Sequence, residues 1–426
     1  MTDARPELKE IGSTGLTRFG GRVYEEYLRE LSGDRWRRVL REMIDQDPII
    51  GATLFAIEML IRQVDWSVRP GADDAASVEA ATFVQECLHD MAATWPDTLA
   101  EILSFLPWGW AYFNVVYKVR QGPQRSADGM PDAVRSSAYT DGRLGWGIWS
   151  IRSQDTLDRW EFGDHGIVSG MWQVAPPSYI PTFIPANLAL HFRATSRKAN
   201  PEGRSILRNA YRPYYFKRNI ENVEGIGIER DLAGLPIVRI PASVIAANGI
   251  EYQAWQNVAI NLRRDEQEGL VIPSDCDKTT GKLLYDVELL TTGGDRQIDT
   301  DKITQRYSAQ IAMTMLADFI LLGHEQVGSF ALASSKTDLF GVALGAWLDS
   351  IAATVNSQAI RPLLHYNGMT PPAPPCLVHS DIESIDLAVL GEYISKLSGA
   401  GAPLFPNDDL LAYLLKQAGL PTAKES

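Results

Sequence analysis

The pattern of apolar and polar residues near the start of the chain is helical. Apolar side chains within residues 34–62 recur at the spacing of one helix face, and the pattern is interrupted at Asp47 and Pro48. Because proline disfavours helical geometry in the residue before it, we expect two helices joined by a short turn. Amphipathic helices are also predicted over residues 75–93 and 95–106.

A β-rich region follows these helices. Residues 108–119 read WGWAYFNVVYKV, and the aromatic and β-branched side chains after the glycine favour a strand. The polar stretch 121–143, rich in Gly, Pro and Ser, is expected to be a mobile loop. Helices combined with short strands predict an α+β fold. Further short strands are predicted at 64–70, 149–153, 156–162 and 169–174.

A basic patch lies at the start of the longest predicted helix. This helix is expected from Ser205 to about Arg230, with Pro213 causing a kink or a later start, because proline inside a helix costs about 3 kcal/mol. No acidic residue interrupts the patch, and its first three members recur at every fourth position, which on a helix places them along one stripe. The patch consists of Arg204, Arg208, Arg212, Lys217 and Arg218.

Several more helices and strands are predicted in the second half of the chain, among them a helix over residues 382–397 and one capped by Asn407. Within residues 299–322 an apolar residue recurs at every fourth position, and Asp299 or Thr300 is expected to cap this helix. Another helix is expected to begin at Thr337. Residues 235–241, LPIVRIP, are predicted to form a strand bounded by prolines.

Composition narrows the class of protein. The chain has 426 residues, of which 45% are hydrophobic, so it has ample material for more than one core. Its formal net charge of -13 argues against tight nucleic-acid binding, because Lys and Arg contacts to phosphate dominate that affinity. Its three cysteines form no CxxC pair, so neither a disulfide framework nor a cysteine-rich zinc site is expected. Without an apolar run of about 18 residues or a signal-peptide core, membrane insertion and secretion are not expected.

Motifs for catalysis and cofactor binding are incomplete. The stretch HEQVG begins like a zinc-protease helix, but Gly328 stands where the second histidine ligand belongs. After Lys282, Leu283 replaces the Ser or Thr of a phosphate loop, and Arg230 replaces the third glycine of a dinucleotide fingerprint. We therefore expect no enzyme activity, no cofactor and no metal site.

Several other side chains fit a functional and a structural interpretation. Trp108 and Trp110 fit a ligand platform, but packing in the core is favoured. His191 is expected to be a structural residue on a strand, with its hydrogen bonds satisfied inside the protein. The adjacent acids at 73–74 and 408–409 are expected to cap helices rather than to form a catalytic pair.

The order of these segments resembles the portal proteins of tailed bacteriophages and of related gene-transfer particles, in particular the type found in Mu-like phages. The stretch DPIIGATLFAIEMLIRQVDWSVRP looks like their early helix and Trp-centred strand, and EILSFLPWGWAYFNVVYKV looks like their helix, glycine and aromatic strand. NPEGRSILRNAYRPYYFKRNIENVEGIGIERDLAGLPIVRIP is similar to their passage of Pro, Gly, an apolar pair, Lys, an acidic end and Gly-x-Pro. The resemblance runs from about Asp47 to Pro421.

The resemblance implies a portal-type fold with a helical stem, an α/β wing and clip, and a small helical crown. It also implies a ring of about twelve subunits around a DNA channel. The expected parts are an N-terminal wing at 1–202, stem helices at 203–233 and 293–322, a clip at 234–292, a tunnel loop and wing helix at 323–370, and a C-terminal crown at 371–426.

The resemblance also implies candidate contacts. The tunnel-loop candidates are Ser329, Ser334, Ser335 and Lys336. These side chains either touch DNA phosphates transiently or only form a flexible connection. Arg263 and Arg264, on the expected clip helix, are candidates for contact with the terminase or with the neighbouring subunit. For the basic patch, ion pairs with acids of the neighbouring subunit are favoured over DNA contact.

The implied partners are further copies of the chain, the large terminase subunit, a head-tail connector, and the major capsid and scaffolding proteins. Double-stranded DNA would be bound transiently and without sequence preference, at a capsid vertex of a virion assembled in the host cytoplasm. No cofactor and no membrane is implied. Two alternatives stay open. One is a soluble, hydrolase-like enzyme, which predicts a monomer or small oligomer with a concave polar pocket, and the other is another ring-forming connector protein.

Overall fold

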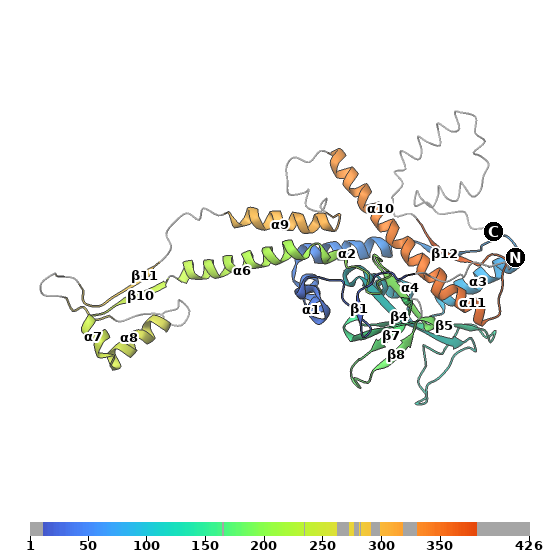
Figure 1. Ribbon diagram of the computed structural model, residues 1–426, viewed down its shortest axis with the longest axis horizontal. Coiled ribbons are helices and arrows are strands. Elements are labelled where there is room, and N and C mark those ends of the chain that lie inside the picture. The colour runs from blue at the N-terminus through green and yellow to red at the C-terminus, as the bar shows by residue number, and fades with distance from the viewer. Residues whose placement is uncertain are drawn as a thin grey trace, which may run out of the picture. The chain divides into compact units, whose positions relative to one another are not determined.

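The described part of the chain divides into two units, each of which mixes helices with short antiparallel strands (Figure 1). The first unit contains the described residues up to Arg208 and from Met315 onward, and the second runs from Asn209 to Thr314. This mixture confirms the α+β class. The computed structural model describes residues 12–163, 166–233, 235–261, 272–276, 281, 283–290, 299–317 and 330–380.

The helices at the start of the first unit begin at polar caps. Asp47, which interrupts the apolar pattern, accepts hydrogen bonds from the N–H groups of Ile49 and Ile50 at 2.9 and 3.1 Å. Asp74 and Thr94 cap two later helices in the same way. The predicted pair of helices is confirmed. The helices are α1 (Gly33–Gln46), α2 (Pro48–Arg62), α3 (Ala75–His89), α4 (Trp95–Leu103) and α5 (Phe105–Trp108).

Two three-stranded antiparallel sheets form the β-rich layer of this unit. In one, β4 lies between β5 and β9, and in the other, β7 lies between β6 and β8. Trp146, Trp149 and Trp160 are almost completely buried, so aromatic residues of the predicted strands also fill the core. The strands are β4 (Trp110–Val119), β5 (Leu144–Arg152), β6 (Leu157–Phe162), β7 (Val168–Gln173), β8 (Thr182–Pro185) and β9 (Ala189–Arg193).

The proline-rich stretch near residue 372 leads into a strand of the first unit. This strand, β12 (Cys376–His379), pairs antiparallel with β3 (Trp66–Arg69), so that Leu377 lies opposite Val68. The strand predicted at 64–70 is therefore confirmed, and its partner comes from the far end of the described chain. The helices predicted beyond residue 381 lie outside the described residues.

A long helical segment joins the sheets of the first unit through side-chain amides. It consists of α10 (Phe330–Val355), a π-helical turn (Asn356–Ile360) and α11 (Arg361–Tyr366), and α10 packs against β9, β12 and α2. The amide of Asn356 bonds both the N–H and the C=O of Leu377, at 2.7 and 3.1 Å. The amide of Asn367 does the same for Leu144, at 2.8 and 2.9 Å. These amides satisfy strand groups that would otherwise lack partners.

One helical stretch among the described residues, Leu339–Tyr366, is long and apolar enough to cross a membrane, with a mean hydropathy of 1.3. Core helices of soluble proteins have the same length and composition. Leu344, Leu348 and Ile351 on this stretch are buried at 1% exposure or less. These three side chains therefore belong to the core of the first unit.

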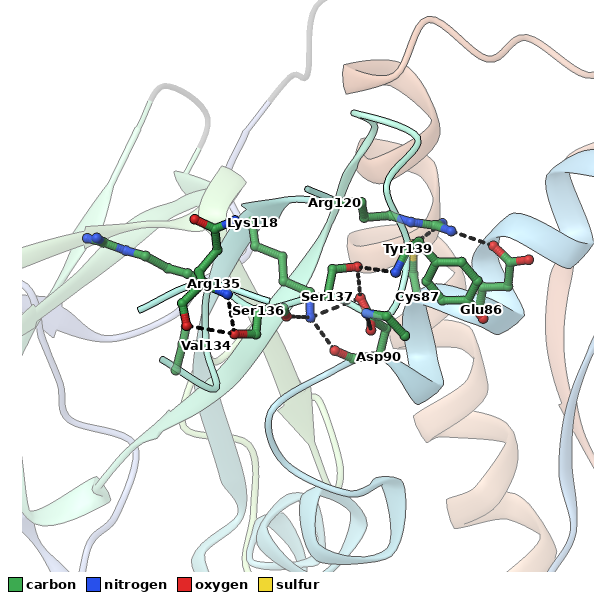
Figure 2. A network of polar contacts seen from close by, with 12 residues as sticks. Glu86, Cys87, Asp90, Lys118, Arg120, Val134, Arg135, Ser136, Ser137 and Tyr139 are labelled. Atoms are coloured by element: carbon green, nitrogen blue, oxygen red, sulfur yellow. Dashed lines mark hydrogen bonds and ion pairs between the residues drawn. The ribbon is translucent and has the colours of Figure 1, made fainter. Parts of the chain in front are cut away.

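A buried ion pair anchors the loop predicted at 121–143 (Figure 2). The Nζ of Lys118 lies 3.0 Å from the carboxylate of Asp90, with side-chain exposures of 1% and 7%, and also donates to the carbonyl of Ser136 at 2.6 Å. Asp90 in turn accepts bonds from the Ser137 hydroxyl at 2.6 Å and the Ala138 N–H at 2.8 Å. The pair thus connects α3, β4 and the loop.

A second buried cation supports the same loop. The Nη2 of Arg120 lies 2.6 Å from the Glu86 carboxylate and 3.1 Å from that of Asp141, and its guanidinium lies 3.9 Å over the ring of Tyr139. Burial raises the pKa of the neighbouring Cys87 thiol to about 11, although Arg120 opposes this shift. The thiol is therefore protonated at neutral pH, which is the state of a structural cysteine.

We predict that Asp90→Asn destabilises the protein by about 3–5 kcal/mol, because it leaves the Lys118 ammonium buried without its counter-ion. Urea unfolding measures the change. As a control, Glu58→Gln removes an exposed helical ion pair with Arg62 and is expected to cost no more than about 0.5 kcal/mol. Equal effects of the two substitutions would contradict the stabilising role of the buried pair.

The contribution of Asp90 is also expected to depend on pH. Burial raises the pKa of Asp90, but the hydrogen bonds from Ala138 and Ser137 and the charge of Lys118 outweigh burial, so the pKa is lowered overall. A lowered carboxyl pKa stabilises the folded state above the unfolded value of about 3.9, and this stabilisation is lost as the pH falls through the folded value. The stability difference between wild type and Asp90→Asn should therefore shrink below about pH 4.

Candidate functional site

The second unit is built on an antiparallel helix hairpin, α6 (Tyr211–Ala233) and α9 (Thr300–Thr314). The rings of Phe216 and Tyr307 stack with centroids 6.0 Å apart, and the Thr300 hydroxyl donates to the Glu224 carboxylate. The carboxylate of Asp299 caps α9, as predicted, by accepting the N–H of Lys302 at 3.0 Å. The hairpin therefore has packing contacts and a defined start of its second helix.

Two strands and two short helices occupy the chain between the hairpin helices. Strand β10 (Leu235–Arg239) pairs antiparallel with β11 (Asp286–Leu290), and Arg239 bonds the carboxylates of Asp286 and Glu288 at 2.8 and 2.6 Å. The ring of Trp255 stacks on Tyr285 at 5.5 Å. The strand predicted at 235–241 is confirmed. The short helices are α7 (Ala242–Ala247) and α8 (Ile250–Asn261).

The long helix begins later than the earliest predicted start. It starts at Tyr211, which puts Pro213 in its first turn, where the missing N–H would have had no helical partner in any case. This confirms the expected late start. The prediction that Arg204, Arg208 and Arg212 form one helical stripe is wrong, because the first two precede the helix.

The basic residues of the patch have separate surroundings. Arg208 ends a 3-10 turn and pairs with the Glu26 carboxylate at 2.5 and 2.7 Å within the same chain. On α6, the Arg212 guanidinium lies 5.9 Å from the ring of Phe216, and that of Arg218 lies 5.9 Å from the ring of Tyr214. Lys217, the remaining member on α6, is buried at 4% exposure, and Arg204 precedes the 3-10 turn.

The second half of the stretch expected to be a tunnel loop, from residue 330 onward, is helical. The helix α10 begins at Phe330, so Ser334, Ser335 and Lys336 belong to its first turns, and Thr337 is not its cap. Small residues such as Ala and Ser do not prevent a helix from extending in this direction. Ser329 lies outside the described residues, as do the clip candidates Arg263 and Arg264.

Apolar side chains on the hairpin are exposed to solvent. Val223, Ile226 and Ile228 on α6 are 69%, 50% and 45% exposed, and Met313 on α9 is 60% exposed. A helix with apolar residues on several sides usually lies in the interior of a protein or an assembly. Exposed apolar side chains of this kind are candidate contacts for a neighbouring surface. The sequence analysis missed this feature, although valine and isoleucine interleaved with glutamates at 221–229 were its visible signal.

The geometry bears on two kinds of site considered from the sequence, a metal site and a pocket. Among the described residues no group of three His, Cys, Asp or Glu side chains is placed to hold a metal ion. The first unit contains a cavity of about 570 Å³, which has both polar and apolar residues around it. Several basic side chains around it form ion pairs with acids on facing segments, among them Arg22, Lys198 and Arg208.

Comparison with solved structures relates this fold to phage-like particles. The chain shares its fold with a chain in the virion of a native gene transfer agent particle, with 12% identity, a TM-score of 0.52, and coverage of 92% of this chain and 95% of that one. A chain in the neck of an empty gene transfer agent particle, computed with C6 symmetry, gives 13% identity, a TM-score of 0.52, and coverage of 91% and 95%. No curated protein matches the chain.

The family comparison covers most of the sequence. Residues 37–410 match the family described as the portal protein of Mu bacteriophage. The matched region includes both hairpin helices, both three-stranded sheets and the long helix α10. The chain therefore belongs to the portal protein family of Mu-like bacteriophages.

Proposed function

We propose that copies of this chain form a closed ring of about twelve subunits at one capsid vertex, and that double-stranded DNA passes through its channel during packaging and ejection. The observation that carries this proposal is the exposed apolar surface of the α6 and α9 hairpin in a chain of the portal family. In a closed ring every subunit makes the same contacts with its neighbours, so the exposed apolar surface of every copy is covered in the same way.

Each region of the chain is given a part in this ring. The hairpin of α6 and α9 is the stem, and β10, β11, α7 and α8 between its helices are the clip. The sheets of the first unit with α10 form the wing, and the chain from residue 371 onward forms the crown. The clip, with Arg263 and Arg264, docks the large terminase subunit, which supplies the energy of packaging. The head-tail connector and the capsid and scaffolding proteins contact the ring from outside.

The charge of the chain suits a channel that lets DNA move. A formal net charge of -13 gives little phosphate neutralisation, so affinity for DNA is low and independent of sequence. The members of the basic patch on α6 and the first residues of α10, with Ser329, make brief contacts to phosphates or to acids of the neighbouring subunit. Base-specific contacts would stop translocation at preferred sequences.

The vertex location can be tested on assembled particles. Gold-labelled antibody against an epitope inserted at the exposed loop near Gly129 is expected to mark one site per particle in electron micrographs. The label should mark DNA-filled and empty heads alike, because the proposed ring is present in both, so the particle population must contain both kinds. Labels distributed over many capsomers, or absent from purified particles, would contradict the proposed location.

We predict that Val223→Asp with Ile226→Asp weakens ring assembly by about 100-fold or more, because each charge would have to be buried without a partner. Native mass spectrometry of the purified chain measures the assembled fraction. The control is Val223→Leu with Ile226→Leu, which keeps both side chains apolar and should assemble like wild type. If the aspartate variant is folded by circular dichroism and still assembles normally, α6 is not a subunit contact.

A further inference from the structure

The cavity in the first unit lies under the N-terminal segment 21–34 and is walled by tryptophans. The residues that line it include Trp36 on α1, Trp108 on α5, Trp110 on β4 and Trp160 on β6. Its volume of about 570 Å³ is within the range of small-molecule sites. Trp110 and Trp160 are also core residues, as expected for the first of them, whereas Trp36 and Trp108 are only partly buried. The wall of the cavity is therefore rich in tryptophan, and Trp36 and Trp108 are the two that are more exposed.

The segment that covers the cavity is held in place by short strands and ion pairs. It contains β2 (Arg22–Val23), which pairs with the preceding β1 (Arg18–Phe19), and a 3-10 turn (Arg29–Leu31). The carbonyl of Gly21 accepts the N–H of Trp160 at 2.9 Å, and a Cβ at Gly21 would lie 2.3 Å from the Trp160 carbonyl oxygen. The ion pairs are Arg22 with Asp158 at 3.0 Å, Glu25 with Lys198 at 2.9 Å, and Glu26 with Arg208 at 2.5 Å.

Other arginines around the cavity do not neutralise its interior. Arg37 donates to the carboxylate of Asp34 and to the carbonyls of Asp155 and Leu157, each at 3.1 Å. Arg197 and Arg204 also line the cavity, but both are exposed to solvent, where their charges are screened.

Glu202 is the one acid that faces this cavity without a basic side chain at ion-pair distance among the described residues. Its carboxylate accepts one hydrogen bond, from the indole Nε1 of Trp160 at 3.3 Å. Burial raises the pKa of Glu202, while the bond from Trp160 and the charge of Arg37 oppose the shift. The Glu202 residue as a whole is only partly buried and lines the cavity, but its carboxyl group is surrounded closely enough for burial to dominate its pKa.

The backbone that carries Glu202 is fixed from both sides. Gly203 has a φ of +55°, and a Cβ there would lie 2.2 Å from the carbonyl oxygen of Gly109. The side chain of Asn200 accepts the N–H of Glu202 at 2.9 Å. The Nε2 of His191 lies 2.7 Å from the carbonyl oxygen of Pro201, which satisfies this histidine as predicted. The fold therefore preorganises the Glu202 carboxylate before any ligand binds.

We propose that this cavity binds a small organic cation, an alkylammonium or guanidinium compound, whose charge pairs with Glu202 and whose chain lies against the indole rings. A buried carboxylate is stabilised by a cation at contact distance, and tryptophan faces attract such cations when both are desolvated. A metal ion such as magnesium or calcium fits less well, because it requires several oxygen ligands and Glu202 supplies one carboxylate. The site does not depend on the proposed ring.

Binding is tested on the purified full-length protein with putrescine as the probe. Isothermal titration, with tryptophan fluorescence as a second readout, is expected to show saturable binding. Butanediol, a neutral compound of the same chain length, is expected not to bind, because it lacks the charges that pair with Glu202. Absence of putrescine binding, or equal binding of butanediol, would overturn the proposal.

The variant Glu202→Gln keeps the size of the side chain and an acceptor for Trp160 but removes its charge. It is expected to weaken putrescine binding by about 30-fold or more. The matched control is Glu161→Gln, because Glu161 also accepts an indole N–H, from Trp172 at 2.8 Å, but at an exposed site outside the cavity. Wild-type affinity in a folded Glu202→Gln protein would refute the assignment. If Glu202→Gln does not fold, the test uses Trp108→Leu instead. Wild-type putrescine affinity in that variant would also refute the assignment.

Discussion

Exposed apolar side chains on a long helix are the constraint on which this account depends. Each Å² of apolar surface removed from water contributes about 25 cal/mol, so a helix that leaves valine and isoleucine exposed is stabilised when another surface covers it. The α9 helix covers only one side of α6, through contacts such as Phe216 with Tyr307. Val223, Ile226 and Ile228 remain for a partner. Repetition of one chain around a closed axis provides that partner for every copy.

The first unit differs from the hairpin, because specific buried polar contacts hold its interior together. The buried pair of Lys118 and Asp90 and the amide bonds of Asn356 and Asn367 connect strands and helices that are far apart in the sequence. Removing one partner of such a contact leaves a buried polar group unsatisfied, which disfavours alternative arrangements. A unit of this kind suits the role of the wing in the ring that we propose. The same rigidity holds Glu202 at its place in the cavity.

Much of the fold was visible in the sequence because it depends on local signals. The break at Asp47, the glycine before the aromatic strand β4 and the cap at Asp299 all act within a few residues. The late start of α6 was foreseen from Pro213 for the same reason. The start of α10 was not, because small residues before Thr337 permit a helix without requiring one.

The candidate sites were harder to predict, since they depend on contacts between distant segments. The spacing of Arg204, Arg208 and Arg212 suggested a stripe, but the helix begins after the first two and Arg208 pairs with Glu26 from the N-terminal segment. The cavity around Glu202 is assembled from α1, α5, β4, β6 and the loop before α6. The spacing of residues along the sequence does not predict that these distant segments lie together. Trp108 and Trp110 were noted as a possible platform, and the structure places both in the cavity wall but only Trp110 in the core.

The measurement that tests the central claim most directly is the mass of the purified full-length chain in solution, by light scattering after size exclusion, with negative-stain images of the largest species. The account predicts a closed ring of about twelve copies with a central opening. A protein that stays monomeric across a wide range of concentration and salt, or that assembles without a central opening, would contradict it.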